Sequence, residues 1–350
     1  MQHRILASLG ILAAMTAMVV PSAGQAPAAA KNSSKVAAKT PAAKKPLPLR
    51  TPWGDPDLQG VWNDATSTPL QRPTGLAEKD VLNDDEAAEF RAQLAHDLTR
   101  DRRDGGAEVD VNRAYNDHWM DSRRLKITAD HRTSLIVDPP NGRIPPLVPL
   151  SPEREQRKAR RAAANTRFNA GLPENYTDFT LPVRCVIRTD SPPYLPTIYN
   201  NDFHIFQSPG YVAIGPEMIH SARIIPLDGH PHVGKNLKQW LGDSRGHWEG
   251  DTLVVETTNF RADDGVVFME ANPDTYKITE RFTRVDATTL NYEFTVEDPK
   301  TWTRPWTARI PWNKIDPDEQ MYEYACHEDN YDMVHFLTGA RAREKRGETK

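Results

Sequence analysis

Three side chains suited to acid–base or anion-binding chemistry fall close together, at Glu217, His220 and Arg223. They lie between two predicted strands, where a bend can direct side chains toward the mouth of a barrel. Glutamate and histidine could act there as an acid–base pair, and arginine could hold a carboxylate or phosphate through two hydrogen bonds. We therefore predict these three residues as the catalytic group. The alternative is a turn with a local salt bridge.

Two further glutamates are candidate ligand-binding residues. Alternation along the predicted strand 276–285 places Glu280 in an apolar row, and Glu256 lies on another predicted strand. A carboxylate inside a barrel can bind a ligand or act in acid–base chemistry, and its burial is costly unless a cation or donor meets it. Arg284 or Arg223 could supply the cation. A structural Glu–Arg pair, or a register in which Glu280 faces water, remains open.

Aromatic side chains add candidates for binding a ring or an amphipathic molecule. Tyr292 lies on the predicted inner face of its strand, and Trp240 and Trp248 bracket a turn-rich stretch. Such aromatic residues can line a ligand pocket. They are also common as core or rim residues, so we keep both interpretations.

His232 is the last ligand-binding candidate, in the loop segment His230-Pro231-His232. Imidazole and carboxylate together suit zinc or copper, but the sequence has no long-range zinc motif such as H-E-x-x-H. It also has no phosphate loop, dinucleotide fingerprint, G-x-S-x-G elbow or EF-hand. We therefore predict neither a metal nor a cofactor.

The elements that must position these residues are predicted strands. Short alternating segments with turn signals and no helix between them indicate an antiparallel meander. Eight strands can close a barrel wide enough for one small ligand, and a sandwich is the alternative. The predicted strands are 203–207, 211–214, 222–227, 252–259, 276–285, 290–297, 306–312 and 321–326.

The chain before the barrel is predicted to be mostly irregular. We expect a wrapping region over residues 51–198, with helices near 84–103 and 152–164 and a short strand at 135–137. The barrel should follow over 199–341. A basic tail should end the chain at 342–350.

The N-terminus has the features of a secretory signal peptide. Arg4 precedes an apolar run at residues 5–20, and small residues follow. This run is too short for a stable membrane span. We predict a signal peptide over 1–28 and a disordered Ala/Lys/Pro tether over 29–50. The mature protein should then be periplasmic or secreted, without a transmembrane segment.

The net charge bears on the class of binding partner, and the cysteine content predicts a disulfide. Of the 44 basic residues, seven (Arg4 and six in the tether) precede the folded part, which leaves 37 against 48 acidic residues, near −11. This balance argues against nucleic acid as a partner. Cys185 and Cys326 are the two cysteines, and an even pair in an exported protein predicts a disulfide.

Several sequence blocks resemble a family of uncharacterised secreted bacterial proteins. This resemblance covers nearly everything after the tether and implies export and a shared fold, but no activity. The Gly-x-Trp motifs at Gly60 and Gly246 are similar to that of lipocalins, which implies a lipocalin-like barrel. The blocks that carry the family resemblance are TPWGDPDLQGVW, TSLIVDPP, IIPLDG, QWLGDSRGHWEGDTLVVETTNF and YEYACHE.

Three functions are consistent with the sequence. The first is an exported protein that binds a small amphipathic or aromatic molecule in the barrel. The second is a periplasmic lyase, isomerase or hydrolase that uses Glu217, His220 and Arg223. The third is a structural envelope protein whose barrel is filled by side chains. The sequence does not indicate an oligomeric state.

Overall fold

The protein is described from a computed structural model, over residues 49–101, 105–112, 116–188, 191–219, 221–261 and 268–348. The predicted signal peptide and nearly all of the predicted tether lie outside these ranges, as does His220. These expectations therefore remain predictions. Leu49 and Arg50, the last two residues of the predicted tether, are described, and Arg50 forms an isolated bridge to Pro56.

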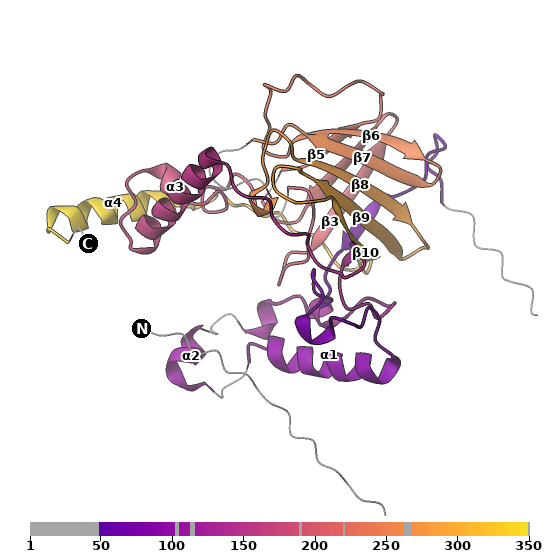
Figure 1. The fold of residues 1–350 in the computed structure, drawn as a ribbon, viewed down its shortest axis with the longest axis horizontal. Coiled ribbons are helices and arrows are strands. Elements are labelled where there is room, and N and C mark those ends of the chain that lie inside the picture. Colours follow the sequence, from indigo (N-terminus) through magenta and orange to yellow (C-terminus); the bar gives the residue numbers. More distant parts are fainter. Residues whose placement is uncertain are drawn as a thin grey trace, which may run out of the picture. The chain divides into compact units, whose positions relative to one another are not determined.

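A nearly closed antiparallel β-barrel dominates the fold (Figure 1). Nine strands pair in the order β5-β4-β3-β1-β10-β9-β8-β7-β6, and a short β2 pairs with β10. The structure thus confirms the predicted mainly β, antiparallel barrel, with more strands than the expected eight. The strands are β1 (Gly60–Asn63), β2 (Ile136–Asp138), β3 (Asp202–Ser208), β4 (Tyr211–Pro216), β5 (Arg223–Pro226), β6 (Asp243–Glu249), β7 (Thr252–Thr258), β8 (Lys277–Arg284), β9 (Thr289–Glu297) and β10 (Trp306–Lys314).

The strand prediction errs at both ends of the barrel sequence. β1 comes from the predicted wrapping region and inserts between β3 and β10, so the barrel does not begin at residue 199. β6 occupies a stretch that we expected to be turn-rich. The predicted strand at 321–326 is wrong. β10 already pairs with β9 on one side and with β1 and β2 on the other, which leaves it no free edge for a following strand.

The two ends of the hydrogen-bonded path, β5 and β6, approach each other closely. A Cβ built on Gly246 in β6 would lie 2.8 Å from Ile225 Cγ2 and 2.7 Å from Leu227 Cδ2. Only a residue without a side chain fits such an approach, since real Cβ atoms are not found this near to other carbons. Gly246 therefore lets the side chains of β5 close the barrel.

Side chains fill the barrel interior. The alternation that predicted the strands is present in β9, where every second residue from Leu290 to Val296 is fully buried. Aromatic rings pack against one another, with centroids 4.5 Å apart for Phe203 and Trp312 and 5.0 Å apart for Tyr292 and Trp312. This packing resembles an ordinary hydrophobic core.

Four α-helices accompany the barrel. Helix α1 (Asp84–Leu98) begins with a capping box between Asn83 and Glu86, and α3 (Pro152–Asn169) begins after the cap residue Ser151. A short α2 (Gly106–Asn112) follows α1. Helix α4 (Asp332–Lys345) occupies part of the stretch that we expected to be a basic tail. In the part of the chain that the structure describes, no helix has the length and apolar character to cross a bilayer.

The predicted disulfide is present. Cys185 and Cys326 are bonded, with their Cα atoms 5.7 Å apart, which is an ordinary separation for such a bond. The bond joins the segment between β2 and β3 to the segment between β10 and α4. It therefore ties together two parts of the chain that are 141 residues apart.

Candidate functional site

The polar groups of interest gather at one end of the barrel. Because neighbouring strands are antiparallel, the starts of β3, β5, β6, β8 and β10 share an end with the ends of β1, β4, β7 and β9. We call this end the polar rim. Loops at the mouth of a barrel are a common place for ligand sites, since the strands hold them rigidly.

A histidine lies between two carboxylates at the polar rim. His232 Nδ1 is 2.7 Å from Asp243 Oδ2, and His232 Nε2 is 3.2 Å from Glu256 Oε1. The Asp243 side chain is 8% exposed, and it also accepts the Val233 backbone N–H at 3.0 Å. Asp243 thus fixes the imidazole, while Nε2 faces the half-exposed Glu256. An imidazole oriented in this way by a buried carboxylate is suited to hydrogen bonding or proton transfer.

His232 forms part of the wall of a cleft of about 1030 Å³. The wall consists of the loop 231–238, the end of β7 and the segment that leads into β8. Three lysines line the cleft, Lys235, Lys238 and Lys277, against one carboxylate, Asp274. We call this the rim cleft. Hydrogen-bond donors predominate in it, and this favours an anionic or hydroxyl-rich ligand over an apolar one.

Hydrogen bonds hold the walls of the rim cleft in place. Asn259, just after β7 and with a left-handed backbone (φ 57°), donates its side-chain amide to Val233 O at 2.9 Å. Lys238 spans the cleft wall and contacts Pro273 O at 3.0 Å and Asp274 Oδ1 at 3.2 Å. The loop is therefore anchored on both sides, and a ligand would find it largely preformed.

A buried hydroxyl without a partner lies at the cleft. Tyr276 is 2% exposed and lines the rim cleft, and its hydroxyl has no hydrogen-bond partner among the described residues. Burial raises the pKa of Tyr276 well above its usual value, and the charges of Glu280 and Asp298 raise it further. The hydroxyl is therefore an uncharged polar group whose hydrogen-bonding capacity is unused.

Arg223 and Glu280, two predicted site residues, pair inside the barrel. Arg223 Nη1 is 2.6 Å from Glu280 Oε2 and Nη2 is 3.1 Å from Oε1, and the two side chains are 2% and 0% exposed. Tyr292 donates its hydroxyl to the same Oε1 at 2.9 Å and accepts the Tyr194 N–H. Burial opposes the guanidinium charge, but adjacent Glu280 raises the pKa of Arg223 above its usual value. The network matches the structural Glu–Arg pair that the sequence left open.

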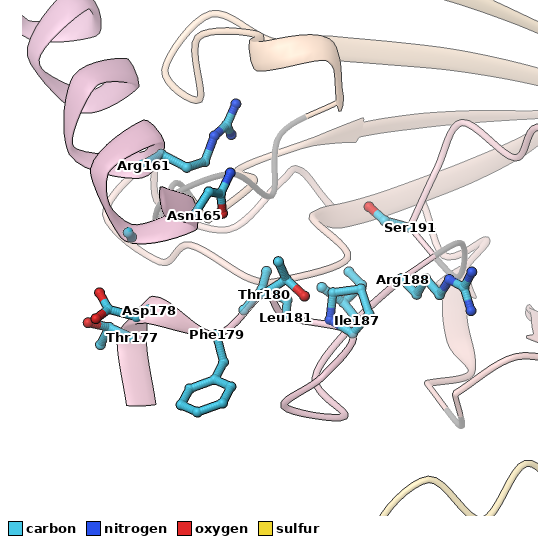
Figure 2. A pocket seen from close by; sticks show the side chains of 12 residues that line it. Arg161, Asn165, Thr177, Asp178, Phe179, Thr180, Leu181, Ile187, Arg188 and Ser191 are labelled. Atoms are coloured by element: carbon cyan, nitrogen blue, oxygen red, sulfur yellow. The ribbon is translucent and has the colours of Figure 1, made fainter. Parts of the chain in front are cut away.

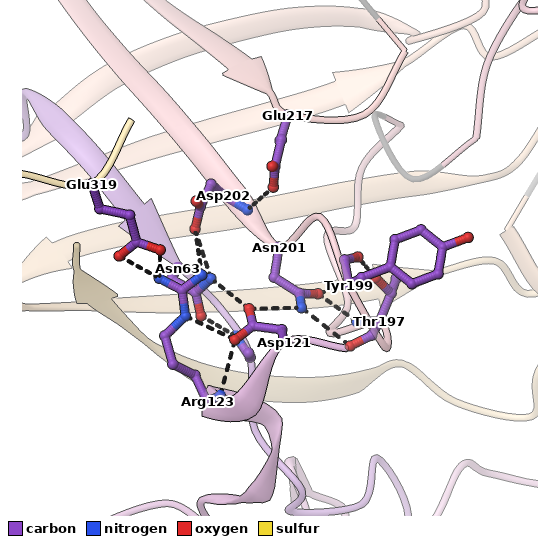
Figure 3. Close-up of polar contacts among 10 residues, drawn as sticks. Asn63, Asp121, Arg123, Thr197, Tyr199, Asn201, Asp202, Glu217 and Glu319 are labelled. Atoms are coloured by element: carbon purple, nitrogen blue, oxygen red, sulfur yellow. Dashed lines mark hydrogen bonds and ion pairs between the residues drawn. The ribbon is translucent and has the colours of Figure 1, made fainter. Parts of the chain in front are cut away.

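Glu217 belongs to a different group, an acidic cluster at the polar rim. Asn63 donates to Asp202 Oδ1 at 2.6 Å and to Asp121 Oδ2 at 3.0 Å, and Glu217 Oε2 accepts the Asp202 N–H at 3.3 Å (Figure 3). Arg123 lies 2.8 Å from Asp121 Oδ1 and 3.6 Å from Asp202 Oδ1. Glu217 and Arg223 thus take part in separate networks.

The pKa values of the carboxyl groups in the acidic cluster are shifted in different directions by their surroundings. Burial raises the pKa of Asp202 and of Glu217. For Asp121, burial acts in the same direction, but hydrogen bonds from Arg123 and Asn63 hold the pKa below its usual value. The cluster therefore holds close together carboxyl groups whose pKa values are shifted in opposite directions, a pattern seen where protons are transferred.

Asp64 adjoins this cluster and has no partner. It is 0% exposed, and neither carboxylate oxygen has a hydrogen-bond partner among the described residues. Burial raises the pKa of Asp64 well above its usual value, and Asp121 and Asp202 raise it further. Asp64 is thus a carboxyl group for which the charged form is strongly disfavoured.

The two predicted tryptophans lie apart from the histidine site. Trp240 is half-buried, with the Arg261 guanidinium 4.4 Å from its ring centroid. Trp248 is half-buried at the end of β6 and packs against the barrel core. The sequence reasoning missed Asp243, Asn259 and Tyr276. Asp243 is the first residue of β6, and no local pattern distinguished it from its neighbours.

A second cleft, of about 440 Å³, lies next to α3 and contains none of the predicted site residues. Figure 2 shows Arg161 and Asn165 of α3 on one side, and Thr180, Leu181 and Ile187 across from them. Its geometry offers no paired acid and base. The rim cleft therefore remains the better candidate.

Neither the search for metal-binding groups nor the comparison with known proteins adds to this description of the site. No group of three or more His, Cys, Asp or Glu within the described ranges has a geometry that could hold a metal ion. No family model, curated protein or solved structure matches this chain. The resemblance to secreted bacterial proteins and to lipocalins therefore stays a prediction.

Proposed function

We propose that this protein binds a small anionic molecule, one that carries a carboxylate or phosphate group, in the rim cleft. The single observation that supports the proposal is His232, which Asp243 fixes in the wall of a cleft with three lysines. The barrel interior is packed with its own side chains, so the proposed site is the rim and not the space between the strands. Two of the predicted ligand-binding residues, His232 and Glu256, meet there at 3.2 Å.

Each wall of the cleft has a role in this proposal. Lys235 has no carboxylate partner among the described residues, so its ammonium group can bind the anion without first breaking an ion pair. Lys277 already contacts Glu256 at 3.3 Å and Glu297 at 2.7 Å. His232 Nε2 donates to the ligand or exchanges a proton with it, and Asp243 stabilises the orientation of the ring.

The proposal is tested by calorimetric titration with inorganic phosphate and citrate as probes. We expect saturable binding, and about tenfold weaker binding in His232→Gln, because one hydrogen bond to a charged group is lost. His247→Gln is the matched control: His247 also contacts a glutamate, Glu249, at 3.2 Å, but at the opposite end of β6. Equal binding by both variants would exclude His232 from the site.

A second candidate function is acid–base catalysis in the same cleft. The specific observation is the carboxylate on each side of the imidazole: Asp243 holds Nδ1, and a substrate that displaces Glu256 from Nε2 can give its proton to that nitrogen. We expect Asp243→Asn to slow turnover of a substrate more than it weakens binding, because the ring would lose its orientation. A proportionate loss of both would support binding alone.

We also propose that the protein is exported. The disulfide fits an oxidising compartment, and the N-terminal sequence has the order of a signal peptide. Intact-mass measurement of protein from the periplasm or the medium should show the loss of the first 24 or 28 residues, as cleavage after Gly24 or Ala28 requires. A full-length chain that stays in the cytoplasm would contradict export.

A further inference from the structure

A second site, with different chemistry, lies between α1 and the segments that cover the barrel. The space is a groove of about 340 Å³, and eight of its thirteen lining residues are apolar. Its apolar wall is formed by Leu70, Leu94, Leu98, Leu135, Leu195 and Ile198. We call it the leucine groove.

The leucine groove is open to solvent along one side. Leu98 and Ile198 are 36% and 42% exposed, whereas Leu135 on the opposite wall is 2% exposed. A groove with a buried floor and exposed apolar edges gains free energy when an apolar group covers it. This geometry suits a narrow aliphatic chain better than a flat protein surface.

One buried cation lines this space, along with four hydroxyl side chains and the apolar residues. Arg124 is 6% exposed, and its Nη2 donates to Leu98 O at 3.1 Å and lies 3.3 Å from Asp117 Oδ1. Its Nε–H has no acceptor among the described residues. A buried guanidinium N–H without a partner is costly, and a carboxylate is its strongest acceptor. The charge of Arg124 thus complements an anionic head group in a groove whose walls complement an aliphatic tail.

From these observations, we propose that the leucine groove binds an amphipathic aliphatic carboxylate, with the tail along the leucines and the carboxylate on Arg124 Nε. This site is independent of the rim cleft, which carries three lysines and lies among other elements. Either site can exist without the other. The ligand chemistry also differs, because the rim cleft offers several ammonium groups and few apolar side chains.

The test is calorimetric titration of the full chain with octanoate, with acetate and octanol as comparison probes. With citrate present at saturation to fill the rim cleft, we expect saturable binding of octanoate, no binding of acetate, and about tenfold weaker binding of octanol, which has no charge to pair with Arg124. Octanol that binds as tightly as octanoate would overturn the assignment of Arg124. Absence of saturable octanoate binding would overturn the whole proposal.

Variants separate binding from folding. Leu98→Glu places a charge at the exposed edge of the groove and should weaken octanoate binding at least tenfold. Leu147→Glu is the matched control, since Leu147 is 64% exposed and lines neither the leucine groove nor the rim cleft, and it should bind octanoate unchanged. Arg124→Lys keeps the charge but removes the Nε–H, and should weaken binding about tenfold. Equal octanoate affinity in Leu98→Glu and Leu147→Glu would refute the site, whatever the result for Arg124.

Discussion

The buried Arg223–Glu280 pair gives the sharpest test of the filled interior. Glu280→Leu leaves the guanidinium, 2% exposed, without its partner, and Arg223→Met leaves the carboxylate, 0% exposed, in the same state. Removal of one member of a buried pair costs about 3–5 kcal/mol. Since folded domains are stable by only about 5–15 kcal/mol, each single change should remove a large part of the stability.

The double variant should behave differently from either single one. Replacing both charges with apolar residues is often neutral or stabilising, by about 1–4 kcal/mol. Against this, the Tyr292 hydroxyl loses its acceptor, which costs about 1–3 kcal/mol. The two effects nearly cancel, so Arg223→Met/Glu280→Leu should be close to the native protein in stability, far above what the sum of the single variants would give.

The assay is urea unfolding followed by circular dichroism, with the disulfide intact. A matched control is the exterior pair Arg309–Glu293, in which Arg309 Nη2 is 2.6 Å from Glu293 Oε2 with side chains 44% and 25% exposed. Single changes there should cost only about 0–1 kcal/mol. If the Arg223 and Glu280 variants lost no more stability than this control, the pair would not be buried. If the double variant stayed folded but lost the anion of the rim cleft, the network would belong to the binding site.

Three further perturbations test the remaining features of the fold. Loss of the disulfide in Cys185→Ser should lower stability by about 5 kcal/mol in the chain-entropy model for a closed loop of this length, and thermal melts with and without reductant measure it. The raised pKa of Asp64 means that its contribution to stability is fully present below the unfolded-state pKa and is lost as the pH rises through the folded-state pKa. Asp64→Asn should therefore melt increasingly above the native protein as the pH rises above about 4, the usual pKa of an aspartate, whereas the exposed Asp318→Asn should follow the native curve. Gly246→Ala should destabilise the barrel by about 1–3 kcal/mol, because its methyl group would meet the side chains of β5, and a native urea midpoint would show that β5 and β6 are farther apart.

Much of the barrel could be predicted because its strands alternate clearly. In β8 and β9 the buried and exposed residues follow the period of two over eight and nine residues. β1 has only four residues, too few to show a period, and its partners β3 and β10 are distant in sequence. β6 was missed because its buried positions hold the small residues Ser244 and Gly246, of which the approach of β5 requires the glycine. The hydrophobicity of the β6 residues alone does not indicate that β5 packs against them.

The sequence predicted which types of residue form the candidate sites, but it predicted only part of their arrangement in space. Alternation placed Glu280 inward, and a cationic partner was expected because a buried carboxylate requires one. The contact between His232 and Glu256 depends on how the loop 231–238 folds over β7, and Asp243 and Asn259 determine that fold through contacts that no local pattern encodes. The catalytic grouping of Glu217 with Arg223 assumed that residues close in sequence share a site. Instead, the start of β5 turns Arg223 into the barrel, while Glu217 stays beside Asp202.

In this antiparallel barrel, the residues that stabilise the fold are different from the residues that we propose to bind a ligand. Among the described residues, the barrel interior is filled by aromatic rings and the buried Arg223–Glu280 ion pair, so a ligand there would have to displace side chains that are already well packed. Alternate strand ends meet at the polar rim, and this brings residues such as His232 and Lys277 together although 45 positions separate them in the sequence. Changes at the rim cleft should therefore alter binding with little effect on unfolding. Changes to the Arg223–Glu280 pair should instead lower the free energy of unfolding with little effect on binding. A series of variants in which ligand affinity and the free energy of unfolding always changed together would contradict this separation.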